Sequence, residues 1–113
     1  GGEPYAAKAL DVDQAKLAHQ NTKESIRNQV ESLYLQLRQT EEQYQAALEN
    51  IKCLEEALRL KQIGYEVGIN VWGDLLAAEA ELTAARAQAA TLKYAHENQK
   101  LLFEKPWIAA LSS

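Results

Sequence analysis

The fold is decided by the stretch Gly64-Tyr65-Glu66-Val67-Gly68-Ile69-Asn70-Val71-Trp72-Gly73-Asp74. This window holds three of the five glycines in the chain, and the other two are its first two residues. The two prolines, Pro4 and Pro106, lie near the ends of the sequence. Glycine and proline interrupt helices more strongly than any other residues. Their placement therefore predicts two long helices joined by a turn in this window.

The residues on both sides of the window repeat with the period of a coiled coil. Before the window, a stripe of mainly apolar residues recurs in alternating steps of four and three: Ile26, Val30, Leu33, Leu37, Thr40, Tyr44, Ala47, Ile51, Leu54 and Leu58. After it, a second stripe alternates steps of three and four: Leu75, Ala78, Leu82, Ala85, Ala89, Leu92, His96, Gln99 and Phe103. A heptad repeat of this kind keeps one face of a helix against a partner helix.

The two heptad stripes fit each other in an antiparallel arrangement. In a hairpin, the residue numbers of facing positions must add up to a constant. Leu58 with Leu82 gives 140, Leu37 with Phe103 also gives 140, and the layers between them alternate between 139 and 140. The midpoint lies close to Asn70, inside the glycine window. We therefore predict an all-α fold, a long antiparallel two-helix coiled-coil hairpin in which the large residues of both stripes are buried.

The expected division of the chain follows from these signals, and 113 residues leave room for one domain. Residues 1–10 are expected to form a lead-in, because Asp11 or Asp13 can cap the start of a helix. The first helix is predicted at 11–64, the tip turn at 65–73 and the second helix at 74–105. Pro106 ends the second helix and leaves an apolar tail at 106–113.

The first predicted helix is longer than the second, so residues before about Leu33 have no partner helix within the chain. A helix takes most of its stability from packing an apolar face, so an unpartnered segment frays unless something outside the chain covers it. Tyr34, Leu48, Leu60 and Leu76 also lie off the two heptad stripes. We therefore expect two hairpins to associate into a four-helix arrangement.

Several classes of function are disfavoured by composition and spacing. The net charge is −4 and no basic run exists, which argues against a nucleic-acid partner. No apolar run approaches the roughly 20 residues that a membrane helix needs. Cys53 is the only cysteine, and His19 and His96 lie roughly 36 Å apart along the predicted helices. A two-helix hairpin also offers no enclosed cavity. We predict no catalytic residue, no cofactor and no metal site.

The residues around the turn match a known family pattern. In that pattern an aromatic or basic residue is followed by a glycine three positions later. An aspartate comes six positions after the glycine, and then an Ala-Glu or Ala-Gln pair and a leucine. The matching residues here are Tyr65, Gly68, Asp74, Ala78, Glu79 and Leu82. Over roughly residues 10–102 the chain resembles the TolC family of outer-membrane efflux and secretion ducts. Where that family often has serine or threonine, this chain has Val71, so we expect Asn70 to cap the second helix instead.

The resemblance implies a role in an envelope-spanning channel. TolC-family members are trimers whose long helices build a periplasmic tunnel, and their hairpin tips meet periplasmic adaptor proteins, also called membrane fusion proteins. It implies that this chain is a helical-hairpin segment of a trimeric efflux or type I secretion channel in a Gram-negative-type envelope. The membrane would be contacted only through parts absent from this chain. The implied adaptor-binding residues at the tip are Gly68, Ile69, Asn70, Val71, Trp72 and Asp74.

Other interpretations stay open from the sequence. The chain can instead be a structural dimerising coiled coil, or the α-hairpin of a periplasmic adaptor protein. Asp74 can serve only to balance the partial positive charge at the start of a helix. Trp72 is either a contact residue for a partner or a lid over the turn.

Overall fold

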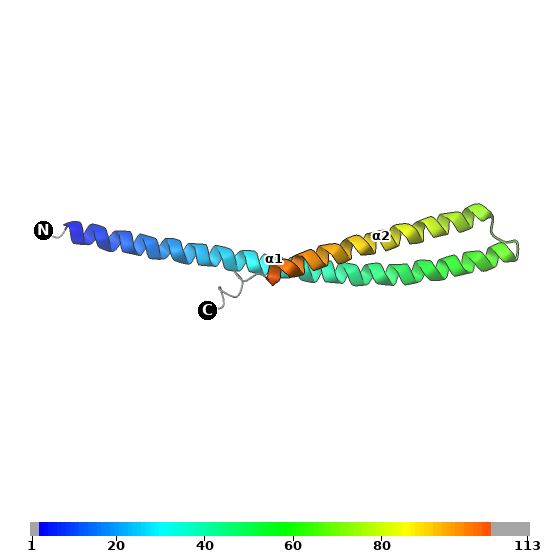
Figure 1. The fold of residues 1–113 in the computed structure, drawn as a ribbon, viewed down its shortest axis with the longest axis horizontal. Helices are drawn as coiled ribbons and strands as arrows, with labels where there is room; N and C mark the ends of the chain where they lie inside the picture. Colours follow the sequence, from blue (N-terminus) through cyan, green and yellow to red (C-terminus); the bar gives the residue numbers. More distant parts are fainter. Residues whose placement is uncertain (1–2, 105–113) are drawn as a thin grey trace. The chain divides into compact units, whose positions relative to one another are not determined.

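The computed structural model describes residues 3–104 of the chain. It contains two α-helices, α1 (Glu3–Glu66) and α2 (Trp72–Phe103), joined by a turn at residues 67–71 (Figure 1). No strand occurs among the described residues. The predicted all-α hairpin is therefore confirmed, with its turn inside the glycine window.

The chain divides into two compact units. Unit 2 is Gln36–Leu102 and contains the hairpin: the later part of α1, the turn, and α2 up to Leu102. Its two helices run antiparallel and side by side (Figure 1). Unit 1 contains the chain up to Leu35 together with Phe103 and the residues that follow it.

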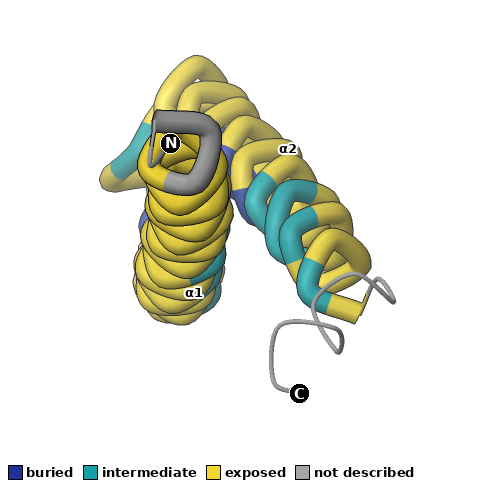
Figure 2. The backbone as a smooth tube through the Cα atoms, turned by 90° about the vertical axis from the view of Figure 1, so that its left-hand side faces the viewer, coloured by how far each residue is buried: buried dark blue, intermediate teal, exposed yellow. Residues whose placement is uncertain are grey.

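The core of unit 2 is narrow. Its buried apolar side chains are Leu75, Leu82, Ala85 and Ala89, all on α2. Every other heptad position within 36–102 is half-buried, apart from Thr40, which is buried. The buried and half-buried segments of the tube in Figure 2 accordingly interrupt a backbone that is mostly exposed. The positions of both heptad stripes in unit 2 are thus those predicted from the sequence.

The depth of burial differs from the prediction. Eight large residues of the two heptad stripes were expected to be buried, and only Leu82 is buried. The other seven are half-buried: Leu37, Tyr44, Ile51, Leu54, Leu58, Leu92 and Phe103. The reason is geometric, because two helices in contact can each shield only one side of a large side chain. The small residues Ala85 and Ala89 are buried in the same seam, since they do not extend beyond the line of contact, whereas Ala47 and Ala78 are half-buried.

The hydroxyl group of Thr40 is satisfied inside its own helix. Thr40 Oγ1 donates to the carbonyl oxygen of Gln36 at 2.9 Å, one turn earlier in α1. A buried hydroxyl without such a bond would destabilise the fold, so this bond allows threonine to occupy a heptad position. On α2 the side-chain oxygen Oε1 of Gln99 is buried without a hydrogen-bond partner.

An ion pair between the helices reports the register. Arg86 Nη2 of α2 lies 3.7 Å from Glu55 Oε1 of α1. Their residue numbers add up to 141, close to the sums of 139 and 140 that were predicted for facing positions. Both side chains are more than half exposed, so the pair contributes little to stability.

A second ion pair lies within α1. Arg59 donates hydrogen bonds of 2.9 and 2.6 Å to Glu56, and these bonds lower the pKa of the Glu56 carboxyl.

The helix bounds differ from the predicted ones. α1 begins at Glu3, so residues 3–10 are helical and are not the lead-in that we expected. Pro4 is compatible with this start, because the N–H groups of the first turn have no partner inside a helix and a missing one costs nothing there. α2 begins at Trp72, two residues earlier than predicted, and ends at Phe103, with Glu104 in a turn. The predicted tail at 106–113 lies outside the described residues.

The early part of α1 has almost no packing. All side chains described from residue 6 to residue 29 are exposed except Ile26, which is half-buried. They include the apolar side chains of Leu10, Val12 and Leu17. An isolated helix is only marginally stable in water, so this segment relies on helix propensity alone.

We expect the backbone amides of residues 8–24 to exchange with solvent at least about tenfold faster than those of residues 78–92, because the early segment lacks packing. Amide hydrogen exchange followed by mass spectrometry or NMR measures both segments in one sample. Equal protection of the two segments, independent of protein concentration, would contradict this expectation.

Candidate functional site

The end of α1 is closed by a Schellman motif. The Ile69 N–H donates to the Gly64 carbonyl at 2.7 Å, and the Gly68 N–H donates to the Tyr65 carbonyl at 3.1 Å. Gly68 has a φ of +82°, which is the left-handed conformation that this motif requires just after the last helical residues. Glycine adopts it without steric penalty, so Gly68 is required by the backbone of the turn.

Asn70 completes the closure of α1. Its side-chain Nδ2 donates to the Lys61 carbonyl at 3.2 Å, and its backbone N–H donates to the Gly64 carbonyl at 3.0 Å. Both carbonyls belong to the last turns of α1, and Gly64 is one of its last four residues, whose carbonyls have no later helical N–H to accept. The prediction that Asn70 caps the second helix is therefore wrong. Its amide nitrogen is the atom that is used, and as a donor it can satisfy only a helix C-terminus.

Gly64 leaves room for the side chain of Asn70. A Cβ atom placed on Gly64 would collide with the side-chain amide of Asn70. Gly73 is different, since a Cβ there would meet nothing within 4 Å. Of the three glycines in the window, Gly64 and Gly68 are thus explained by the structure of the turn, whereas nothing in residues 3–104 explains Gly73.

The start of α2 is stabilised by Asp74. The Val71 N–H donates to Asp74 Oδ2 at 3.1 Å, and the Asp74 N–H donates to the Val71 carbonyl at 3.0 Å. This is one half of a capping box; the other half is missing because the valine side chain has no oxygen. A carboxylate in the first turn also offsets the partial positive charge of the helix start, an effect of about 0.3–1 kcal/mol. Asp74 therefore has a structural role in the turn.

Two aromatic rings pack across the turn. The ring centroids of Tyr65, at the end of α1, and Trp72, at the start of α2, lie 5.6 Å apart with an interplanar angle of 59°. Contact of this kind between aromatic rings is favourable. Trp72 thus covers the Tyr65 ring with one part of its surface, while more than half of its surface stays exposed to solvent.

The outer surface of the turn is apolar, and we call it the tip patch: Val67, Ile69, Val71 and Trp72. Each of the four side chains is more than half exposed, and Ile69 is 80% exposed. In a Schellman motif the residue at the Ile69 position often packs on a side chain five or six residues earlier. The residue five positions earlier is Gly64, which has no side chain for Ile69 to pack on. Clustered exposed apolar side chains are characteristic of interaction surfaces.

The six residues predicted to bind a partner all lie in the turn or in the first turn of α2: Gly68, Ile69, Asn70, Val71, Trp72 and Asp74. Their binding of a partner stays a prediction. Tyr65 and Val67 belong to the same surface and were absent from the predicted set. Tyr65 could have been included because it belongs to the family pattern. Val67 could have been included because it is an apolar residue inside a glycine-rich turn.

Other kinds of site find little support in the described residues. Within 3–104, no group of three or more His, Cys, Asp or Glu side chains is placed to hold a metal ion. Cys53 is exposed. Neither α1 nor α2 contains, in its described part, a segment with the length and hydrophobicity that a membrane crossing requires.

Comparison with known families identifies the chain. A family model described as "Outer membrane efflux protein" matches residues 5–101. The chain belongs to the outer membrane efflux protein family. The resemblance inferred from the tip residues is therefore confirmed. No curated protein and no solved structure gave a significant match.

The match assigns the chain to a family of transport proteins. It covers most of α1, the whole turn and nearly all of α2, so the tip patch lies inside the matched region. Membership indicates a part in outer-membrane efflux, which is a transport function and not an enzymatic one.

We expect Gly64→Ala to lower the free energy of unfolding by about 1–3 kcal/mol, because the new methyl group displaces the Asn70 amide. In an Asn70→Ala background the same change should be neutral or stabilising, since the collision is gone and alanine favours helix. Urea unfolding of the two single variants and the double variant, at one protein concentration, gives the coupling between the positions. Additive effects would show that Asn70 does not constrain Gly64.

Proposed function

We propose that the chain is a periplasmic hairpin of a trimeric outer-membrane efflux or type I secretion channel. In this proposal α1 and α2 form part of the tunnel wall, and the tip docks a periplasmic adaptor protein. Family membership supports the channel. It also favours the channel over the alternative that the hairpin belongs to the adaptor itself.

The observation that carries the docking proposal is the exposure of Ile69. This side chain is 80% exposed although the backbone on both sides of it is fixed by hydrogen bonds to Gly64. A rigid turn presents an apolar side chain without the entropy cost of ordering a flexible loop on binding. The tip patch is therefore preorganised for contact with another protein.

Gly73 gives independent support to the same surface. It lies in the first turn of α2, where alanine would favour the helix by up to about 1 kcal/mol. Apart from its two chain neighbours and the nearby backbone of α2, no atom of the described chain comes within 4 Å of the position that its Cβ would take. No contact within the described chain requires glycine here, but the close approach of a partner backbone would require it.

The adaptor contact of one hairpin would be small. A turn of five residues and its flanks offers far less area than a stable protein interface, so a single tip should bind weakly. In a trimer, several tips are held in one ring and can bind together, and this multivalency raises the overall affinity without any new contact.

We expect Ile69→Asp, in the full-length channel, to weaken adaptor binding by at least about tenfold and to reduce efflux, because it places a charge on the contact surface. Gly73→Ala should raise the stability of the hairpin and also weaken adaptor binding. The matched control is Tyr94→Asp, which changes an exposed residue of α2 away from the tip.

Helicity and trimer assembly must be measured alongside binding, so that a folding defect is not mistaken for a docking defect. Gly68 and Asp74 are less suitable positions, since both stabilise the turn. Normal adaptor binding and normal efflux in Ile69→Asp and Gly73→Ala would show that the tip is only a turn.

We also propose that isolated hairpins associate into a four-helix arrangement. The off-seam residues Leu60 and Leu76 are about half exposed in unit 2, and a two-helix seam leaves such residues without cover. In a channel wall each helix has neighbours on two sides, which explains a second set of apolar residues.

At tens of micromolar we expect sedimentation analysis to show dimers of the chain, because association covers these residues. The double variant Leu60→Glu, Leu76→Glu should shift the chain toward monomer while its helical content is kept. Tyr94→Glu serves as the control for adding charge to an exposed position. A wild-type chain that sediments only as monomer would contradict the proposal.

A further inference from the structure

The charged residues that flank the seam of unit 2 gather on one side of it. In an antiparallel pair of heptad helices, the rows beside the two stripes form two opposite sides, and each side combines rows of both helices. The ion pair of Glu55 with Arg86 marks one of these sides, which we call the charged side. On α1 it consists of every seventh residue from Arg38 to Arg59 and from Glu41 to Gln62. On α2 it consists of every seventh residue from Leu76 to Glu97 and from Glu79 to Lys100.

The opposite side carries almost no charge, and we call it the neutral face. On α1 it consists of every seventh residue from Gln36 to Ala57 and from Gln39 to Leu60. On α2 it consists of every seventh residue from Ala77 to Asn98 and from Glu81 to Leu102. Each side has four rows of four positions; ten positions of the charged side are ionisable, against Glu81 alone in the neutral face.

A groove lies on the neutral face. It has a volume of about 440 Å³, and its lining residues are Gln43, Ala46, Ala47, Asn50, Gln88 and Leu92. The amide side chains of Gln43, Asn50 and Gln88 are exposed. In the described part of the chain, none of these three amides forms a side-chain hydrogen bond. The groove is therefore polar and uncharged, and its hydrogen-bonding groups are unused.

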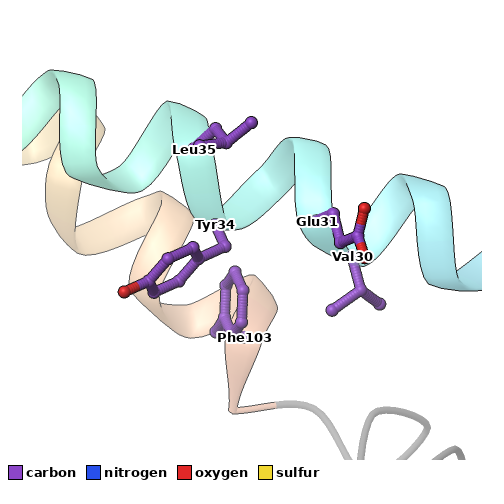
Figure 3. Close-up of a pocket in the computed structure, with 5 residues that line it drawn as sticks. All are labelled: Val30, Glu31, Tyr34, Leu35 and Phe103. Carbon is purple, nitrogen blue, oxygen red and sulfur yellow. The ribbon is translucent and has the colours of Figure 1, made fainter.

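Figure 3 shows a different groove, which lies within unit 1. It has a volume of about 380 Å³ and is lined by Val30, Glu31, Tyr34, Leu35 and Phe103. The ring centroids of Tyr34 and Phe103 lie 6.1 Å apart. Val30 and Phe103 are positions of the heptad stripes, so this groove belongs to the seam and not to the neutral face. Its lining contains no amide, so a group that fits one groove does not fit the other.

We propose that the neutral face is the surface through which a second copy of the chain packs, with the same face of both copies in contact. The inference rests on the proposed association of isolated hairpins, and it names the side of the hairpin that the association buries. Leu60, which is 54% exposed, belongs to this face.

The amides make the neutral face complementary to itself. A carboxamide carries both a hydrogen-bond donor and an acceptor, so Asn50 or Gln88 can pair with an amide of an identical face. A two-fold dimer requires such self-complementarity, because the same patch is used on both copies. The alanines between the amides allow the helices of the second copy to come close, since the distance between packed helices depends on the side chains at the contact.

Charge favours the neutral face over the opposite side. Burial of the charged side would remove ten ionisable groups from water, which is costly unless each gains a well-placed partner. The chain has a net charge of −4, so two copies repel each other, and a face with one carboxylate adds least to this repulsion at the contact.

The size of the neutral face is adequate for a dimer. Its rows span 24 residues from Gln36 to Leu60, or roughly 36 Å, and two adjacent helices are about 20 Å wide. The product is on the order of 700 Å² per copy, close to the ~800 Å² per partner of a standard interface.

Matched substitutions on the two sides test the proposal. Ala84 lies in the neutral face and Ala90 on the charged side, and both are exposed residues of α2. In sedimentation analysis we expect Ala84→Arg to raise the dissociation constant of the dimer at least about tenfold, and Ala90→Arg to change it less than about threefold. On α1, Asn50→Asp and Gln45→Glu form a second pair that adds charge with little change of shape. Circular dichroism checks that helical content is kept.

The native thiol gives a second readout without any substitution. Cys53 belongs to the neutral face and is exposed in the single chain. We expect a maleimide to label it at least about fivefold more slowly in the dimer than in the monomer obtained by dilution. With Cys53→Ser, a cysteine introduced as Lys52→Cys lies on the charged side, and its labelling rate should not depend on protein concentration.

The results separate this inference from the association on which it rests. A wild-type dimer that both members of each pair weaken equally, or that leaves the labelling of Cys53 unchanged, would overturn the neutral face as the interface while the association stands. A wild-type chain that is only monomeric at tens of micromolar would overturn both.

Discussion

The hairpin depends on a reversal of the backbone that is completed in the five residues 67–71. The carbonyl of Gly64 is central to it, because it accepts the N–H groups of both Ile69 and Asn70. These bonds close α1, and the short span to α2 then fixes which heptad positions face each other. A seam with a seven-residue repeat can align equally well one heptad away, so the seam alone does not choose its register. The turn makes that choice.

The sequence was sufficient for the features that depend on period and count. The positions of both heptad stripes, the antiparallel direction and the location of the turn all follow from spacing, and spacing is a property of the chain itself. The cap at Asn70 was wrong because asparagine carries both a donor and an acceptor and lies between two helix ends. Only the three-dimensional path of the turn decides which end it serves. The start of α1 was wrong for a similar reason, since Pro4 is compatible with a loop and with a first helical turn.

The tip patch could be found from the sequence only in part. Apolar residues between glycines indicated an exposed surface, but the structural roles of Gly64 and Asp74 required coordinates. Those roles matter for function, because a change at Gly64, Gly68 or Asp74 alters the turn itself, whereas the side chain of Ile69 and the position of Gly73 have no such role. The structure thus separates residues that build the surface from residues that are free to contact a partner.

The hydroxyl of Thr40 has a mechanical consequence. It is the polar side chain buried in the described seam, and its hydrogen bond stays within α1. At this layer the two helices are therefore held by interlocked side chains and not by a directional bond between them. Interlocked side chains oppose a small slide along the helix axes, but a slide by a whole heptad would bring equivalent positions together again. The covalent connection through the turn is what prevents a slip of that size.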